Sequence, residues 1–205
     1  MGRSVTYYLS LASPWTYLGS EVFSRILQEQ AAEVQVRPID LGAIFPKTGG
    51  LPLPQRAPER QAYRLVELER WRKLRGLPLN LQPRFFPVSQ DKAACLVIAA
   101  DESGNDALGL AHRLLRAVWA EERNIDDSET LYALATECGL EAAPLLTRSA
   151  EPGIAQRFQS YTQEALEAGV FGAPTYLLDG ELFWGQDRLD FLEAKLKGGT
   201  TSKRA

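Results

Sequence analysis

The residues Ser13-Pro14-Trp15-Thr16 follow a strand-like run and are the first whose types and spacing can do chemistry. Serine is a favoured N-cap residue and proline is tolerated at the first helical position, so this string predicts a helix start. Unpaired amides and the dipole favour negative charge there, and a serine hydroxyl can donate a hydrogen bond to a thiolate that another molecule brings. Helix capping alone explains the same string, and both interpretations stay open.

A second string, Val170-Phe171-Gly172-Ala173-Pro174-Thr175, carries a proline at the predicted start of a strand. The loss of one amide donor costs little at that position. A cis bond before Pro174 would leave the backbone of Ala173 as an unpaired edge, to which a peptide-like ligand can add by strand-type hydrogen bonds. A plain trans proline at a strand start is the alternative.

A third string, Trp184-Gly185-Gln186-Asp187-Arg188, lies between a predicted strand and a predicted helix. Gln186 and Asp187 are therefore expected next to helix N-terminal amides, which form an environment that binds a carboxylate. The carboxylate of Asp187 can also pair with an α-amino group. Simple capping of the helix by Asp187 is the alternative.

The elements that must position these strings are predicted at the two ends of the chain. Strands over 5–11 and 34–39 flank the helix that begins at Ser13, which favours a parallel β-α-β unit. At the other end, the turn Asp179-Gly180 joins strands over 174–178 and 181–184 into a hairpin, and a helix follows over 187–197.

The middle of the chain is predicted to be helical. Residues 42–57 are rich in Gly and Pro and predict a loop, and the tail 198–205 is expected to fray. Helical patterns, most of them followed by a glycine, cover the ranges 58–75, 91–103, 106–123, 128–138 and 152–168.

A β-α-β half and a β-β-α half are the two parts of a thioredoxin fold. The sequence therefore predicts an α/β chain with a thioredoxin-like fold that is split by a helical insertion domain. Residues 1–57 and 169–205 would form the thioredoxin-like domain, and residues 58–168 the insertion. The chemistry of that fold lies at the start of the first helix, where this chain carries Ser13 and no cysteine.

Composition excludes several classes of protein. The 205 residues are 45% apolar and 24% charged, as in an ordinary globular protein. A net charge of -3 without a long basic run argues against a nucleic-acid partner, because the stretch 70–75 lies beside two glutamates and is typical of a solvated helix face. No apolar run reaches about 18 residues, so no membrane span is predicted. The N-terminal residues lack a signal-peptide pattern, which favours the cytoplasm.

Cysteine and histidine offer no site of their own. Cys95 and Cys138 lie far apart in helical patterns, which favours apolar packing over a disulfide or a zinc site. The single histidine, His112, has no ligand partner at metal-binding spacing and no nucleophile motif to complete a Ser-His-Asp triad. We therefore expect neither a metal site nor a hydrolytic triad.

The strings 13–19, 170–175 and 179–189 together resemble the 2-hydroxychromene-2-carboxylate isomerase family. That family is related to kappa-class glutathione transferases and, more distantly, to DsbA-type oxidoreductases. The resemblance covers essentially the whole chain and is strongest in the C-terminal string. It implies a glutathione-dependent homodimeric enzyme of aromatic catabolism.

The resemblance also implies roles for particular residues. Ser13 would hold the glutathione thiolate, and Ala173, fixed by Pro174, would pair its backbone with the cysteinyl part. A basic residue that approaches glutathione matches Arg60, and a residue that contacts an aromatic substrate matches Phe85. The γ-glutamyl end would be held by four consecutive residues, Trp184, Gly185, Gln186 and Asp187.

This chain departs from the family pattern at three positions. Ser10 lies in the first strand where relatives usually carry Asp, and Leu51 is the nearest match to a common Asn. Phe45 occupies the position of a basic residue that binds the substrate carboxylate in the isomerase. These departures affect the identity of the substrate more than the use of glutathione.

The leading hypothesis is a glutathione-dependent isomerase of an aromatic unsaturated keto acid or its cyclic hemiketal. The thiolate would add to the conjugated carbon, the former double bond would rotate, and glutathione would leave unchanged. A kappa-class-like glutathione transferase and a redox-silent thioredoxin-like module that binds peptides or a partner protein are the alternatives. A disulfide oxidoreductase is disfavoured because no cysteine lies at the first helix.

Overall fold

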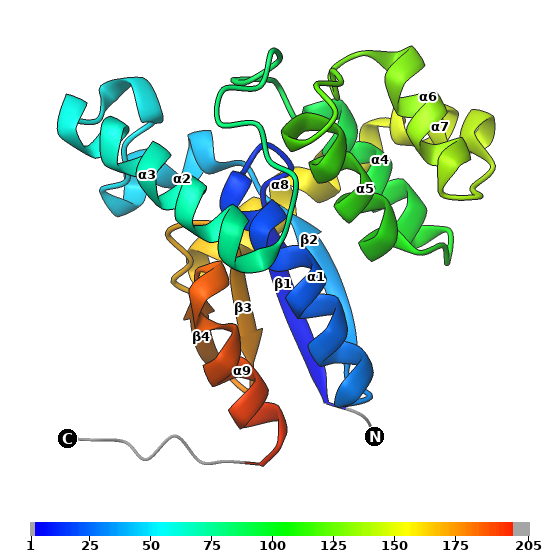
Figure 1. The fold of residues 1–205 in the computed structure, drawn as a ribbon. Coiled ribbons are helices and arrows are strands. Elements are labelled where there is room, and N and C mark those ends of the chain that lie inside the picture. Colours follow the sequence, from blue (N-terminus) through cyan, green and yellow to red (C-terminus); the bar gives the residue numbers. More distant parts are fainter. Residues whose placement is uncertain (1–2, 199–205) are drawn as a thin grey trace.

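The computed structural model describes residues 3–198 of the chain, so all of the tail predicted to fray except Gly198 lies outside the described residues. Within the described range, one sheet has the strand order β2-β1-β3-β4 (Figure 1). Its strands are β1 (Ser4–Leu9), β2 (Glu33–Pro38), β3 (Thr175–Leu178) and β4 (Glu181–Trp184). The pair β1–β2 is parallel, whereas β1–β3 and β3–β4 are antiparallel. The predicted β-α-β and β-β-α halves therefore meet in one thioredoxin-like sheet.

Helices pack around this sheet, and further helices lie beyond its upper end in Figure 1. The helices are α1 (Pro14–Glu29), α2 (Leu41–Thr48), α3 (Pro58–Arg75), α4 (Asp91–Glu102), α5 (Ala107–Trp119), α6 (Ser128–Glu137), α7 (Ala142–Ser149), α8 (Pro152–Glu167) and α9 (Leu189–Leu196), with short 3-10 turns η1 (Leu53–Gln55) and η2 (Gln186–Arg188). In Figure 1, α2 and α3 lie to one side above the sheet, and α4 to α7 lie to the other. None of the described helices is long and apolar enough to cross a membrane.

Both faces of the sheet are buried, because neighbouring residues of a strand point to opposite faces. Tyr7 points to the face covered by α1 and α9, where its ring stacks on Tyr176 with centroids 5.1 Å apart and meets Phe23 at 4.7 Å. The next residue, Tyr8, belongs to a separate apolar cluster that includes Ala165 of α8. The sheet is thus held between two helical layers.

The buried side chain of Gln90, just before α4, ties the helical segment to the ends of β1 and β2. Its Oε1 accepts hydrogen bonds from the Leu11 amide at 2.6 Å and the Ser10 hydroxyl at 2.9 Å. Its Nε2 donates to the Ile39 carbonyl at 2.8 Å. Ser10, one of the departures from the family pattern, therefore serves to hold Gln90.

Two helices lie where none was predicted. The range predicted as a loop, 42–57, contains most of α2 and all of η1, because the Asp40 side chain caps α2 by accepting from the Gly42 amide at 2.7 Å. The helix α7 begins at Ala142 and carries Pro144 in its first turn, where a proline is tolerated. The Gly and Pro content of 42–57 is typical of a loop, yet α2 accommodates Pro46, and no element was predicted over 142–149.

Several boundaries also differ from the prediction. The helix α6 is capped by Asp127, whose carboxylate accepts from the Thr130 amide at 2.8 Å, and Ser128 is its first residue. The final helix is preceded by η2 and begins at Leu189, two residues later than predicted. The division into residues 1–57 with 169–205 and residues 58–168 stays a prediction, and α8 of the predicted insertion packs against β2.

Candidate functional site

Ser13 is the N-cap of α1, as the sequence predicted. Its Oγ accepts a hydrogen bond from the Thr16 amide at 3.3 Å, and Pro14 is the first residue of the helix. Because capping uses only a lone pair of the oxygen, the hydroxyl proton of Ser13 remains available to a ligand. The side chain is almost fully buried at 6% exposure, so a thiolate that reaches it would be shielded from water.

The turn before β3 faces this site with an unpaired backbone. The bond between Ala173 and Pro174 is cis, as predicted. The turn is held by the Thr175 hydroxyl, which donates to the Gly172 carbonyl at 2.7 Å, and by the Gly185 amide, which donates to the Pro174 carbonyl at 2.9 Å. Within residues 3–198, neither the amide nor the carbonyl of Ala173 makes a backbone hydrogen bond. This edge is open to a peptide-like ligand.

The junction from β4 to α9 depends on two glycines. Gly185 has φ +102°, and a Cβ there would lie 2.5 Å from Oδ1 of Asp187. On α1, a Cβ at Gly19 would lie 2.9 Å from the Cβ of Gln186, so glycine allows η2 to approach the helix closely. Gln186 is consequently buried, with 1% exposure.

Asp187 does not cap its helix. Neither η2 nor α9 has a side-chain cap, so the capping alternative is wrong. The carboxylate instead pairs with Arg188 at 2.6 Å and remains partly exposed. It is therefore accessible to a cationic group of a ligand.

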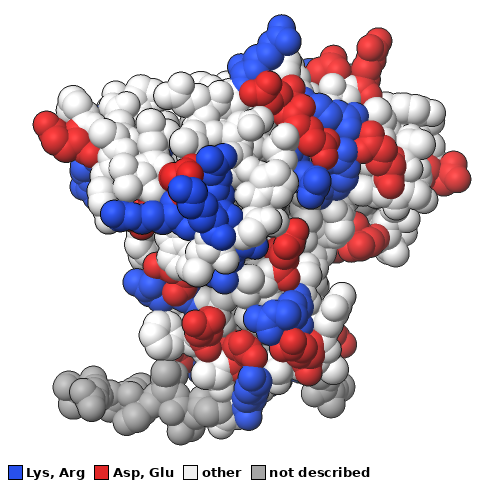
Figure 2. Space-filling model, in the orientation of Figure 1, with Lys and Arg blue, Asp and Glu red and all other residues white. Residues whose placement is uncertain are grey.

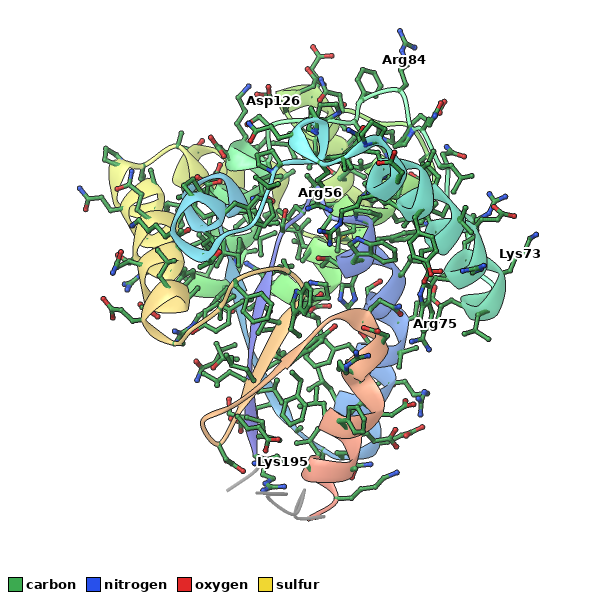
Figure 3. The ribbon with its side chains drawn as sticks, turned by 90° about the vertical axis from the view of Figure 1, so that its left-hand side faces the viewer. Arg56, Lys73, Arg75, Arg84, Asp126 and Lys195 are labelled. Carbon is green, nitrogen blue, oxygen red and sulfur yellow. The ribbon has the colours of Figure 1, made fainter. Side chains whose placement is uncertain are left out.

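The last turn of α3 fixes this junction from the other side. The guanidinium of Arg75 donates from Nη2 to the Gln186 carbonyl at 3.1 Å and to its Oε1 at 3.0 Å. The remaining cations of the stretch 70–75 pair with Glu67 and Glu69, as expected of a solvated face. Figure 3 shows Arg75 at the end of α3 and Lys73 directed away from the molecule.

A cavity of about 600 Å³ lies between α3 and the junction. The predicted site residues that line it are Arg60, Ala173, Trp184, Gly185, Gln186 and Asp187. Ser13 and Pro174 are not on the lining, but they adjoin it through Trp15 and Ala173, which are. Phe85 is also absent from the lining. The volume of the cavity is in the range of small-molecule and cofactor sites.

The sequence interpretation missed several residues that line this cavity. They come from α3 and the turn before it: Arg56, Tyr63, Arg64, Glu67 and Trp71. Within the predicted helix, Arg60 and Arg64 are four residues apart, and this spacing is a signal that could have found them together, because residues four apart share one helix face. Arg56 precedes the helix, so no helical spacing points to it.

Burial favours the uncharged forms of the histidine and the two cysteines. Burial lowers the pKa of His112 to about 4, so its imidazole is neutral at pH 7, and its Nδ1 lies 3.3 Å from the Ser24 hydroxyl. Burial raises the pKa of both free thiols, Cys95 and Cys138, which disfavours their thiolates. Across the described residues, no group of three or more candidate ligands could hold a metal ion.

Comparisons with known proteins agree with this geometry. The model of the DSBA-like thioredoxin domain matches residues 4–197. The 2-hydroxychromene-2-carboxylate isomerase of Pseudomonas putida is 30% identical over 196 residues, which are 94% of this chain and 93% of that protein. Human glutathione S-transferase kappa 1 is 25% identical over 202 residues, covering 93% of this chain and 89% of its own.

Solved structures lead to the same group. A structure of 2-hydroxychromene-2-carboxylate isomerase superposes with a TM-score of 0.83 at 26% identity and covers 95% of both chains. The cytosolic disulfide reductase DsbM from Pseudomonas aeruginosa, solved with GSH, shares the fold with a TM-score of 0.69 at 18% identity over 95% of this chain and 99% of its own. The chain therefore belongs to the DSBA-like thioredoxin domain family, and it is an enzyme of the kind represented by 2-hydroxychromene-2-carboxylate isomerase and glutathione S-transferase kappa.

Proposed function

We propose that this enzyme is a glutathione-dependent isomerase of an aromatic unsaturated keto acid or its cyclic hemiketal, of the 2-hydroxychromene-2-carboxylate type. The observation that carries the proposal is the cavity that joins the open backbone edge of Ala173 to the junction 184–187 beside the start of α1. Full-length similarity to proteins named as this isomerase supports the reaction type.

The residues of the cavity fit the parts of glutathione. The amide and carbonyl of Ala173 would pair with the cysteinyl residue in the manner of an added strand. The amides of Gln186 and Asp187 suit the γ-glutamyl carboxylate, since that of Gly185 already donates to Pro174, and the carboxylate of Asp187 suits the α-amino group. Arg60 is a cation on the cavity wall with no carboxylate partner among the described residues, so it suits the remaining carboxylate.

Ser13 and the start of α1 would hold the sulfur as a thiolate. The hydroxyl proton of Ser13 is free to donate, and the helix dipole favours negative charge at this end. Both effects lower the pKa of a thiol bound there. No cysteine of this chain competes for the position, since Cys95 and Cys138 lie outside the cavity lining.

Bound glutathione would supply the nucleophilic thiolate that adds reversibly to the conjugated carbon and thereby permits rotation about the former double bond. The protein's part is to position that nucleophile and to stabilise its charge. Aromatic surface for the body of the substrate would come from Trp15, Tyr63, Trp71 and Trp184, which line the cavity, whereas Phe85 lies outside the lining. The Ser13 hydroxyl would again donate a hydrogen bond to the sulfur as it departs as a thiolate.

A second candidate is a glutathione transferase of the kappa type. It is favoured by Phe45, which stands where the isomerase carries a basic residue for the substrate carboxylate. Full-length similarity to human glutathione S-transferase kappa 1 supports it as well. The two candidates share the glutathione site and differ in whether the sulfur remains on the product.

Calorimetry with glutathione is the first test of the proposed function. We expect binding in the micromolar to millimolar range, and an absence of binding at about 10 mM would contradict both candidates. The protein is then mixed with 2-hydroxychromene-2-carboxylate, and absorbance is followed with and without glutathione. Turnover without glutathione would contradict the mechanism, and mass spectrometry of a product that retains glutathione would identify a transferase.

The oligomeric state and the cellular location are predictions that need experiments of their own. The expected homodimer is tested by sedimentation equilibrium of the full chain, where a monomer at micromolar concentration would contradict it. The expected cytoplasmic location is tested by fractionation of cells that express the tagged chain.

A further inference from the structure

Three guanidinium groups follow one another along the α3 side of the cavity. Arg56 lies just before α3, and Arg60 and Arg64 lie one turn apart within it. None of the three has a carboxylate partner among the residues that the structure describes. On the face drawn in Figure 2, by comparison, acidic and basic side chains lie interspersed.

The carboxylates of the same cavity do not neutralise these cations. Glu67 pairs with Arg70 at 2.6 Å, and Asp187 pairs with Arg188 at 2.6 Å. Like charges one helical turn apart repel each other. The free protein therefore carries an electrostatic cost along this wall, and a bound anion would relieve it.

Arg64 is the most desolvated member of the trio. Its guanidinium carbon lies 5.4 Å from the ring centroid of Phe86 and 5.8 Å from that of the fully buried Trp119. Burial and the charge of Arg56 lower the pKa of Arg64 to about 10, so the group remains cationic at neutral pH. A cation held mainly by ring faces retains donors for an anion.

Arg56 adds a further cation to this wall from the turn before α3. Its Nε donates to the Leu51 carbonyl at 2.8 Å, which fixes the side chain and leaves its terminal donors without a carboxylate. Burial and the neighbouring Arg60 lower the pKa of Arg56. Figure 3 shows Arg56 in the interior of the view, whereas Arg84 extends outward from the surface.

Glutathione as proposed above accounts for only part of this charge. Its γ-glutamyl carboxylate falls to the junction 185–187, and its other carboxylate falls to the exposed Arg60. The guanidinium groups of Arg64 and Arg56 therefore have no anionic partner in the proposed glutathione complex. Tyr63 and Trp71 of the same helix line the cavity with Arg64, so a cation and an aromatic surface adjoin each other on this wall.

We propose that Arg64, supported by Arg56, binds the acid group of the second substrate and makes the enzyme selective for aromatic compounds that carry a carboxylate. The assignment rests on the proposed glutathione function for the identity of the other ligand. A guanidinium presents two parallel donors to a carboxylate, which an uncharged substrate cannot use. Arg64 is thus a specificity residue and takes no part in the covalent step.

The test compares two ligands of similar size and shape, of which one is an anion and one is neutral, trans-cinnamate and its primary amide, by calorimetry with and without saturating glutathione. We expect the wild-type protein to bind cinnamate more tightly than the amide. Arg64→Gln should weaken cinnamate binding by roughly 10- to 100-fold and change amide binding little. Arg64→Lys, which keeps the charge but loses the paired donors, should fall between them.

Lys73→Gln is the matched control. It removes one positive charge from the same helix at a residue that pairs with Glu69 and points away from the molecule. It should leave the binding of both ligands unchanged. Circular dichroism of each variant confirms that the helix is retained.

Three outcomes would overturn the assignment. Equal affinity of the wild-type protein for the two ligands would show that no acid group is selected. An equal loss for both ligands in Arg64→Gln would show that Arg64 acts through packing alone. Weaker glutathione binding in Arg64→Gln with unchanged cinnamate binding would assign Arg64 to the glutathione carboxylate and leave the glutathione function intact. Failure of the wild-type protein to bind glutathione would overturn that function separately, because cinnamate is also titrated without glutathione.

Discussion

The hydroxyl of Ser13 combines a structural and a chemical role in one atom. Its oxygen accepts from the Thr16 amide and so fixes the side chain at the helix start. The proton that capping leaves unused is then already oriented when a ligand arrives. Orientation before binding reduces the entropy that a catalytic hydrogen bond otherwise costs.

Replacement of Ser13 by alanine should therefore slow turnover far more than it weakens glutathione binding. Loss of one preorganised donor to a developing or resident anion typically lowers kcat by about 100-fold. The pKa of the bound thiol should rise, which is measured by following thiolate absorbance against pH. Ser13→Thr keeps both the cap and the hydroxyl and serves as the control. An unaltered pH–rate profile in Ser13→Ala would count against the role given to Ser13.

His112 should make the stability of the protein depend on pH. Burial lowers its pKa to about 4 in the folded protein, below the ordinary value of 6.5. The unfolded chain therefore binds the proton more tightly than the folded protein does. The contribution of His112 leaves the free energy of unfolding at its maximum above pH 6.5 and lowers it, by up to about 3 kcal/mol, as the pH falls toward 4. Urea unfolding at several pH values measures this decrease.

The His112→Gln variant separates this effect from the titration of carboxylates. It retains a polar side chain beside the Ser24 hydroxyl but cannot take up the proton. Its stability should vary less with pH between 6.5 and 4 than that of the wild-type protein. Parallel curves for the two proteins would show that His112 does not titrate as its burial indicates.

At the scale of elements, α3 builds the site from both of its ends. Its first turns carry Arg60 and Arg64 along the cavity, and its last turn holds Gln186 through Arg75. The αL glycine Gly76 ends the helix directly after this contact. A shift of α3 along its axis would therefore disturb the cationic wall and the junction together.

Arg75→Gln should weaken glutathione binding by about 10-fold, because it removes a half-buried guanidinium that makes charge-assisted hydrogen bonds to Gln186. Since Arg75 only positions the junction, kcat at saturating glutathione should change much less than the Kd. Lys73→Gln, on the outer face of the same helix, is the control. If Arg75→Gln leaves the Kd for glutathione unchanged and lowers the Tm, then Arg75 has a structural role only.

For the whole molecule, Gln90 makes one of the contacts that join the helical segment to the sheet. One amide side chain serves the Leu11 amide, the Ser10 hydroxyl and the Ile39 carbonyl, at the ends of the two parallel strands. This contact lies next to the start of α1, where the site begins. Stability of the fold and geometry of the site are linked through it.

Gln90→Leu should lower the free energy of unfolding by about 2–4 kcal/mol, because it leaves buried backbone groups without partners. Guanidinium unfolding measures the loss. Gln159→Leu makes the same substitution at an exposed position of α8 and should change stability by less than about 0.5 kcal/mol. A loss for Gln90→Leu as small as that of the control would mean that water replaces the amide.

The sequence by itself determined the features that short-range interactions control. The cap Ser13-Pro14, the hairpin turn Asp179-Gly180 and the end of α3 at Gly76 each depend on residues only a few positions apart. The sequence pattern therefore predicted the two halves of the fold, and together with the family resemblance it named six of the residues that line the cavity. The sequence pattern did not predict the helices α2 and α7. Both contain a proline, a residue typical of loops, and α7 depends on packing against α4.

Tertiary structure alone decided the contacts between residues distant in sequence. Gln90 meets Leu11 across 79 positions, and Arg75 meets Gln186 across 111. The unpaired state of Arg64 likewise depends on which side chains surround it. No local pattern encodes such partners, because the gain from burial and hydrogen bonding arises only after the chain has folded. Ser13 was visible as a helix cap from the sequence, and the cationic wall of its cavity became visible only in three dimensions.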